Sequence, residues 1–250
     1  MTTDIDMDTH ARIGVIADIH GNLPALDAVL AALSAAGIEQ IVCLGDVCVG
    51  GPFPTQCIAT LRAFGIPTVS GNTDVWAVTH DPDVLSAVPN WMDDVRRWGA
   101  RQLSAADRNW LAALPQQLAI HLPGEQLLLA LHAAPHSDRE NVLPQTPPEE
   151  ILAWFDGVTA DVIAVGHTHE PLLRRVDDYR ILNPGSIGAP FNRQRLPRYN
   201  RQLRAEYAIV EASAAGSSVT LHELRIDPAS WRQAVHASGM PHAERWLSYA

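Results

Sequence analysis

Residues that can bind metal ions stand at the ends of several short apolar runs in this chain. Their side chains carry carboxylate, imidazole or amide groups. Most of them either come directly after a glycine or belong to a pair of such residues that are two positions apart. Six segments have this form: Asp18-Ile19-His20, Gly45-Asp46, Gly71-Asn72, Leu131-His132, Gly166-His167-Thr168-His169 and, at the expected edge of a site, Asn183-Pro184-Gly185. Mixed oxygen and nitrogen donors in this number suit two divalent ions that activate a water molecule for hydrolysis.

Each segment has a simpler explanation when it is taken alone. A D-x-H tripeptide, Gly-Asp or Gly-Asn fits a solvated turn. His132, which ends the apolar run 127–131, fits a hydrogen-bonded core histidine. Turn formation does not explain why these residue types follow separate apolar runs in the order D-x-H, G-D, G-N, H and G-H-x-H. The ordered set therefore favours a metal site.

Composition limits the size and partners of the protein. The chain has 250 residues, 47% of them hydrophobic, and a formal net charge of −10. We predict one domain over residues 10–250, because the expected ligands run from Asp18 to His169 and neither half holds a complete set. The acidic balance argues against binding of duplex nucleic acid. A small-molecule phosphoester stays compatible with it, since bound cations add positive charge locally.

The basic residues and the cysteines restrict the chemistry further. All 18 basic residues are arginines, which excludes a lysine Schiff base and the phosphate loop G-x-x-x-x-G-K-[ST]. The arginine-rich segment Arg193–Arg204 can attract an anionic substrate, or it can be a solvated loop or a subunit contact in a homo-oligomer. Cys43, Cys48 and Cys57 are odd in number and accompany no leader or long apolar span. We therefore expect a reducing cytoplasm and no membrane.

The first ligands are expected after the strands of a repeated strand–helix pattern. Asn22 can cap a helix that ends at Gly37. The strands are expected at 12–17, 40–44 and 67–70, with a second helix at 54–64. In open α/β sheets, sites form outside the carboxyl ends of such strands. The spacing thus predicts that these ligands meet at one sheet edge.

The remainder of the chain changes in character. Residues 1–9 are polar and acidic, and we expect them to be a disordered tail. Residues 81–114 predict helices that form a scaffold or a cap over the site, with Ser104 and Asp107 as a capping box. Strands are expected at 118–122, 126–131, 161–165, 172–176, 180–182, 207–210 and 219–224, with helices at 148–155 and 228–235. This order predicts two sheets packed face to face with helices outside.

The ordered motifs resemble the calcineurin-like metallophosphoesterase superfamily. Ala17-Asp18-Ile19-His20-Gly21-Asn22 and Gly71-Asn72-Thr73-Asp74 are most similar to its small prokaryotic phosphodiesterase branch, and the resemblance covers roughly residues 13–190. It implies an α/β fold, a four-layer α/β/β/α sandwich with two metal ions at the sheet edges. It also implies that Asp18, His20 and His169 hold the first ion, that Asn72, His132 and His167 hold the second, and that Asp46 bridges them. Mn²⁺ is favoured, and Fe, Zn²⁺, Ni²⁺ or Co²⁺ also suit such ligands.

The resemblance implies hydrolysis of a phosphoester by a water or hydroxide that bridges the ions, with Asp46, Asn72 and His132 at the reaction centre. Many family members have a histidine directly after the metal-binding asparagine, where it can act as a general acid. This chain has Thr73 there. The departure favours small phosphodiesters or nucleotide-like phosphoesters, because good leaving groups need no strong acid.

Other activities are compatible with the same motifs. A phosphomonoesterase or protein phosphatase would need the same metal ligands. A non-catalytic metal-binding scaffold of this fold is an alternative from another class, although such relatives tend to lose ligands. A β-lactamase-like hydrolase fits less well, because its H-x-H motif usually comes early in the chain.

Five further residues are candidates for contact with the substrate. They are Asn22, Thr73, Asp74, His136 and Arg139. Asp74 can instead orient a metal ligand. Helix capping accounts equally well for Asn22, and a role in a surface loop accounts for His136 and Arg139.

Overall fold

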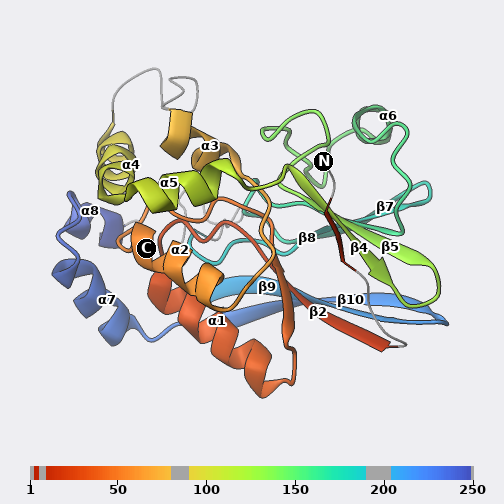
Figure 1. The fold of residues 1–250 in the computed structure, drawn as a ribbon, viewed down its shortest axis with the longest axis horizontal. Coiled ribbons are helices and arrows are strands. Elements are labelled where there is room, and N and C mark those ends of the chain that lie inside the picture. The colour runs from red at the N-terminus through yellow and green to blue at the C-terminus, as the bar shows by residue number, and fades with distance from the viewer. Residues whose placement is uncertain (1–2, 6–9, 80–89, 190–203, 249–250) are drawn as a thin grey trace.

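A computed structural model describes residues 3–5, 10–79, 90–189 and 204–248 of the chain. Its elements form two sheets and the helices around them (Figure 1). Three predictions lie partly outside the described residues: the tail at 1–2 and 6–9, the helical segment at 81–89, and the arginine-rich segment, which includes Arg193, Arg195, Arg198 and Arg201. Arg204 begins a strand.

A four-stranded mixed sheet contains the earliest predicted strands. Strand β2 (His10–Ile16) runs parallel to β3 (Gln40–Cys43) and antiparallel to β9 (Arg204–Ser213), which pairs with β10 (Gly216–Arg225). Helices α1 (Leu23–Ala35) and α2 (Pro54–Ala63) bury their apolar residues against its outer face. Asn22 caps α1 by accepting a hydrogen bond from the Ala25 N–H, as predicted.

A six-stranded mixed sheet has the order β1-β4-β5-β6-β8-β7. The bounds are β1 Thr3–Ile5, β4 Gln117–Leu122, β5 Gln126–Leu131, β6 Val162–Ala164, β7 Leu172–Val176 and β8 Tyr179–Asn183. Strands β5, β6 and β8 are parallel neighbours. Helix α6 (Pro148–Trp154) packs on the outer face through Ile151, with Phe155 beside it.

The two sheets share a core that is built almost entirely from aliphatic side chains. Val15 and Val42 from the first sheet belong to the same buried cluster as Leu128 and Leu182 from the second, and all four are fully or almost fully buried. This core separates the helices on the first sheet from α6 on the second. The layers are therefore those of the predicted α/β/β/α sandwich, with two mixed sheets flanked by helices.

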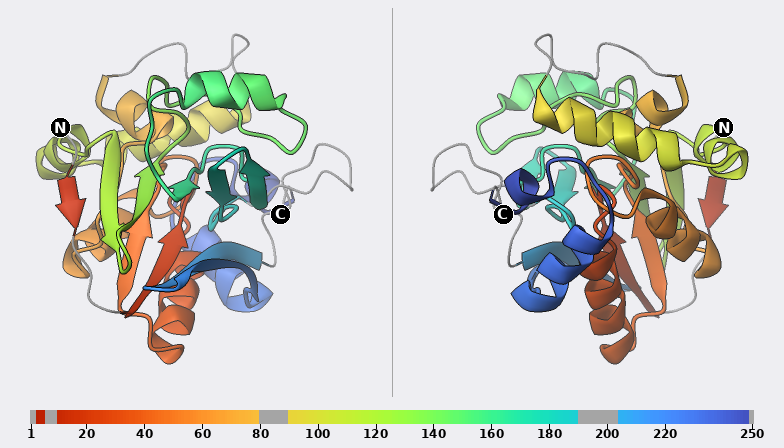
Figure 2. Two further views of the ribbon diagram at one scale, coloured as in Figure 1. Left: turned by 90° about the vertical axis from the view of Figure 1, so that its right-hand side faces the viewer. Right: turned by 90° about the vertical axis from the view of Figure 1, so that its left-hand side faces the viewer.

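Further helices join α1 and α2 on the side of the first sheet. Helices α4 (Trp91–Gln102) and α5 (Ala105–Ala112) form within the predicted helical segment, and the capping box of Ser104 and Asp107 is confirmed. Helix α7 (Pro228–Ala237) lies beside α1, and α8 (Ala243–Ser248) lies beside α4 (Figures 1 and 2). None of the described helices is long and apolar enough to cross a bilayer.

Two local predictions differ from the structure, and helices such as α3 (Asn72–Thr79) were not predicted. Residues 67–70 form only an isolated bridge between Thr68 and Cys43, because the short segment turns at once toward α3. Thr3–Ile5 lie within the stretch expected to be a disordered tail. They pair as β1 with β4, whose edge would otherwise leave its backbone groups unpaired.

The core between the sheets yields a stability prediction. Leu128 is fully buried there, so Leu128→Ala should lower the free energy of unfolding by about 2–5 kcal/mol through lost burial and a residual cavity. Leu173→Ala, at a strand residue that is 48% exposed, should change it by less than about 0.5 kcal/mol. Urea unfolding of both variants measures the difference, and equal effects would contradict this account of the core.

Candidate metal centre

The candidate ligands lie after the carboxyl ends of parallel strands. Asp18 and His20 follow β2, Asp46 follows β3, and His132 follows β5. The pair His167 and His169 follows β6, and Asn72 is the first residue of α3. Since β2 and β3 belong to one sheet and β5 and β6 to the other, the structure brings both sheet edges to one place. The convergence expected from the sequence is present.

The backbone at the ligands has an uncommon conformation. Left-handed φ angles occur at five ligands, namely Asp18 (54°), His20 (47°), Asp46 (55°), His167 (68°) and His169 (57°). Residues with a side chain rarely adopt this region, and each such residue costs on the order of 1 kcal/mol. Such strain clusters at functional sites, where it aims side chains that regular strands would point elsewhere.

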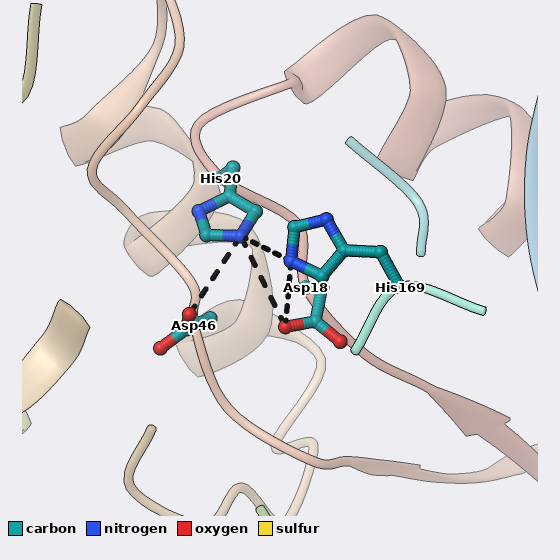
Figure 3. A group of neighbouring side chains, drawn as sticks. All are labelled: Asp18, His20, Asp46 and His169. Atoms are coloured by element: carbon teal, nitrogen blue, oxygen red, sulfur yellow. Dashed lines mark hydrogen bonds and ion pairs between the residues drawn. The ribbon is translucent and has the colours of Figure 1, made fainter. Parts of the chain in front are cut away.

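The first donor group consists of Asp18, His20 and His169, and Asp46 lies beside it (Figure 3). One ligand atom from each of these four side chains lies within 4.8 Å of the others. The Nε2 atoms of His20 and His169 are 3.0 Å apart, and His169 Nε2 is 3.3 Å from Asp18 Oδ1. This spacing gathers two imidazoles and two carboxylates around one point.

Hydrogen bonds on the far side of these rings determine which nitrogen faces the centre. His20 Nδ1 donates to the Val49 carbonyl at 2.9 Å, and His169 Nδ1 donates to the Ala189 carbonyl at 2.8 Å. In the neutral rings both Nε2 atoms then point lone pairs at each other across 3.0 Å. A cation between them relieves this repulsion, so the donor set fits a metal ion.

The second donor group consists of Asn72, His132 and His167. Asn72 Oδ1 is 3.0 Å from His132 Nε2 and 3.0 Å from His167 Nδ1, and His132 Nδ1 donates to the Leu44 carbonyl at 2.7 Å. Asp46 again stands beside the group, because its Oδ1 is 3.6 Å from His132 Nε2. These atoms also fit a metal ion of mixed oxygen and nitrogen preference.

Asp46 is placed to serve both groups. Its Oδ2 atom lies 3.6 Å from His20 Nε2 in the first group, whereas Oδ1 faces His132 in the second. The Thr73 backbone N–H donates to Oδ1 at 2.9 Å and holds the carboxylate. A Cβ at Gly71 would overlap Asp46 Oδ1, so only glycine allows this approach. A carboxylate with one oxygen toward each group suits a bridge between two ions.

The charges at the centre depend on one another. Burial raises the pKa of Asp18 and Asp46, but neighbouring histidines, chiefly His169 for Asp18 and His132 for Asp46, lower both below their ordinary value. Burial lowers the pKa of His132 and His169, and the two carboxylates raise it above the ordinary value. Without ions, these two imidazoles therefore hold a proton more strongly than a free imidazole does, and cations would compete with those protons.

The other two histidines favour the neutral form. Burial, followed by the charge of His169, lowers the pKa of His20 to about 4. Burial and the charge of His132 lower that of His167 to about 4. Each donor group therefore contains one imidazole that is ready to bind a cation at neutral pH without losing a proton.

Asp74 joins the loop that carries Asp46 to the loop that carries Asn72. Its carboxylate accepts hydrogen bonds from the backbone N–H groups of Asp46 (2.8 Å), Val47 (3.0 Å) and Gly71 (3.1 Å). Burial and the charge of Asp46 raise its pKa to about 7, an effect that nearby cations would reduce. Because Asp74 is completely buried, a substrate cannot reach it. Its hydrogen bonds instead hold the two loops that carry Asp46 and Asn72.

The segment after β8 supports Asp18 and the H-x-H turn. Asn183 Nδ2 donates to the Gly166 carbonyl at 2.7 Å and to Thr168 Oγ1 at 3.0 Å. Ser186 Oγ donates to the Asp18 carbonyl at 2.7 Å. The backbone support that the sequence indicated at this segment is present, and it includes side chains as well.

Glu206 holds this segment from behind. Its carboxylate accepts a hydrogen bond from the Ser186 N–H at 3.3 Å and pairs with Arg204 at 3.0 Å. Burial raises its pKa to about 7, although the charge of Arg204 opposes the shift. The sequence did not indicate this role, because an acid in a strand of alternating polarity is typical of a solvated face.

The remaining candidates for substrate contact differ in their surroundings. Asn22 is buried and caps α1, and the hydroxyl of the buried Thr73 has no hydrogen-bond partner among the described residues. His136 is exposed and lies 3.5 Å from Glu140, and Arg139 pairs with its neighbour in the chain. A cavity of about 210 Å³ adjoins the second donor group, and its lining includes His132, His136, Ser70, Gln116, Ser137 and Asp138.

Residues 11–213 match the calcineurin-like phosphoesterase superfamily domain. The chain belongs to this superfamily. The match confirms the family indicated by the order of the motifs, and it includes all seven candidate ligands of this phosphoesterase.

Several relatives resemble the phosphoesterase over most of its length. An uncharacterized protein of Methanocaldococcus jannaschii, MJ0912, is 28% identical over 203 residues, which are 72% of this chain and 77% of the relative. The crystal structure of a metallophosphoesterase from Sphaerobacter thermophilus is 27% identical, covers 95% of this chain and 98% of its own, and has a TM-score of 0.71. Hypothetical protein PH1004 from Pyrococcus horikoshii, at 22% identity, covers 95% and 96% with a TM-score of 0.76, which shows the same fold.

The position of Asp74 yields a prediction about metal affinity. Asp74→Asn replaces a carboxylate oxygen by an NH₂ group that cannot accept the backbone hydrogen bonds. We expect affinity for added Mn²⁺ to fall about 10–100-fold, and the free energy of unfolding to fall by about 1–3 kcal/mol. Asp156→Asn, at an exposed residue, is the control. Titration with Mn²⁺ measures both variants, and wild-type affinity in Asp74→Asn would exclude the orienting role.

The raised pKa of Glu206 yields a prediction about pH. An ordinary glutamate releases its proton near pH 4.5, whereas folded Glu206 keeps it up to about pH 7. Between these values the folded state binds more protons, so this residue makes the free energy of unfolding fall as pH rises. Relative to wild type, Glu206→Gln should therefore gain up to about 3 kcal/mol between pH 5 and pH 8.

Urea unfolding in the presence of a chelator measures this effect at both pH values. Glu211→Gln, at a partly exposed residue of the same strand, is the matched control and should keep the wild-type difference between pH 5 and pH 8. A constant offset between Glu206→Gln and wild type at the two pH values would contradict the assignment.

Proposed function

We propose that this phosphoesterase uses two divalent metal ions to hydrolyse small phosphodiesters or nucleotide-like phosphoesters. The observation that carries the proposal is the position of Asp46 between two donor groups, with one oxygen 3.6 Å from an imidazole of each. The first ion would be held by Asp18, His20 and His169 and the second by Asn72, His132 and His167, with Asp46 shared. Mn²⁺ is our favoured metal, since the donors are mixed nitrogen and oxygen.

Two ions at these positions would supply a water of lowered pKa and positive charge for the phosphoryl oxygens. The chain's own contribution is orientation. The Val49, Leu44 and Ala189 carbonyls hold three imidazoles with Nε2 toward the centre. The Thr73 N–H and the Gly71 backbone hold the Asp46 carboxylate. Fixed donors need no rearrangement as charge develops, which is the usual source of electrostatic catalysis.

Thr73 supports the preference for phosphodiesters. In many family members a histidine directly follows the metal-binding asparagine, whereas Thr73 follows Asn72 here. The Thr73 hydroxyl is buried and is too weak an acid to protonate a leaving group. A substrate with a good leaving group needs no such proton. His136 lines the cavity beside His132, and we assign it and Arg139 to contact with the organic part of the ester. A small-molecule partner fits this cavity better than duplex nucleic acid does.

The cysteines support a cytoplasmic location for the proposed enzyme. Cys43, Cys48 and Cys57 are free and buried, and burial raises the pKa of all three thiols. They would stay reduced and unreactive in the cytoplasm. All three pack in the buried hydrophobic cluster that contains the apolar side chains of α1 and α2.

Turnover of a bis-aryl phosphodiester with added Mn²⁺ tests the proposal. We expect hydrolysis by wild type, about two bound ions per chain, and no hydrolysis after removal of the metal by a chelator. Asp46→Asn should lower kcat/KM more than about 100-fold, beyond what loss of a residue that only orients a ligand causes, and should lower the metal content. Asp156→Asn, at an exposed residue, should keep both near wild type.

The outcomes separate the competing functions. Near-normal turnover and metal content in Asp46→Asn would exclude the proposed mechanism. Two bound ions without hydrolysis of any phosphoester would favour a non-catalytic scaffold. Faster hydrolysis of aryl phosphomonoesters than of diesters would instead assign a phosphomonoesterase.

A further inference from the structure

The C-terminal helices α7 and α8 lie outside the residues that match the family, yet each donates a hydrogen bond to a segment close to His20. Each supplies one fully buried tryptophan, Trp231 from α7 and Trp246 from α8. The two rings pack together with centroids 5.0 Å apart. We call these two residues the tryptophan pair.

Trp246 reaches the loop that holds a candidate metal ligand. Its Nε1–H donates to the Gly50 carbonyl at 2.8 Å, and the bond is buried. The preceding residue, Val49, uses its carbonyl to accept the hydrogen bond from His20 Nδ1. The indole of Trp246 is therefore one residue away from the group that orients the His20 ring.

The loop needs such an anchor because of its composition. Val49 is followed by Gly50 and Gly51, and glycine has the greatest backbone freedom of any residue. Gly50 has a φ of 114°, and a Cβ built there would lie 3.3 Å from His20 Nδ1, so backbone and ring are in close contact. Movement of this peptide would move the carbonyl on which His20 depends.

Trp231 holds the other side of the same ligand. Its Nε1–H donates to Asn22 Oδ1 at 3.2 Å in a buried hydrogen bond, and Asn22 lies two residues after His20. Asn22 also accepts from the Ala25 N–H, so the indole and the helix terminus fix the same side chain. The tryptophan pair thus donates hydrogen bonds to two segments that contact or flank His20, the Val49–Gly50 loop and Asn22.

We propose that Trp246 and Trp231 are positioning residues for the first metal ion, acting on His20 through the Gly50 carbonyl and the Asn22 side chain. This inference rests on the proposed two-metal function. The second donor group depends on another support, because His132 Nδ1 donates to the Leu44 carbonyl at the end of β3. Loss of the indole N–H donors should therefore lower the affinity for the first ion and leave the affinity for the second unchanged.

Trp246→Phe tests the proposal, because it keeps a buried ring and removes the N–H donor. Titration with Mn²⁺, followed by the paramagnetic resonance of the free ion, gives the affinity of each site. We expect the Kd of one site to rise about 10-fold, at the lower end of the range for groups that orient a ligand, and the other to stay unchanged. Trp231→Phe should act in the same direction. Trp154→Phe, at the partly buried last residue of α6, is the control and should leave both unchanged.

A double-mutant cycle connects the effect to His20. In the His20→Ala background, Trp246→Phe should cause no further loss of affinity, because the ring through which it acts is gone. Thermal unfolding without metal identifies variants that are merely destabilised, and if Trp246→Phe does not fold, Trp231→Phe is measured in its place.

The two levels of the proposal fail in different ways. Wild type that binds no Mn²⁺ would overturn the proposed function and this inference with it. Wild type that binds two ions, with folded Trp246→Phe binding both equally well or losing both equally, would overturn the inference alone.

Discussion

The shared carboxylate of Asp46 is the interaction on which the rest of the centre depends. Its two oxygens face different donor groups, so its position determines whether two ions can lie close together. That position follows from the end of β3, from the three backbone hydrogen bonds accepted by Asp74, and from the absence of a side chain at Gly71. A displacement of about 1 Å at this carboxylate would alter both donor groups at once. The buried hydrogen bonds of Asp74 and the close approach of Gly71 prevent such a displacement.

Such a centre is costly for the fold without ions. Five ligands have left-handed backbone, and the acids Asp18 and Asp46 are buried beside imidazoles that compete for protons. The aliphatic core between the sheets and the packing of the helices must offset these costs. The close packing of that core also limits relaxation, so the ligands keep their arrangement. Stability and function are therefore separated in space: the core lies between the sheets, and the strain lies at their carboxyl edges.

The sequence predicts the layers well, and it identifies the candidate ligands, because both leave local marks. A ligand such as Asp46 stands directly after an apolar strand, and strands such as β5 have short apolar runs bounded by turn residues. Helix α3 escaped prediction because it starts at the ligand Asn72 and has eight residues, too few for a clear periodicity. Strand β1 depends on pairing with β4, a long-range contact that three polar and apolar residues do not reveal.

The supporting residues escape prediction for a different reason. Glu206 and Trp246 act on backbone N–H and C=O groups, which every residue carries, so their partners have no signature in the sequence. Their positions also fit simpler roles, an acid on a strand and an aromatic residue on an amphipathic helix. Only the assembled chain shows that a carbonyl of a glycine-rich loop lies 2.8 Å from an indole nitrogen. Because ligand orientation passes through such unmarked groups, a family's ligands can be transferred by motif, whereas the residues that tune each ion must be found in the individual structure.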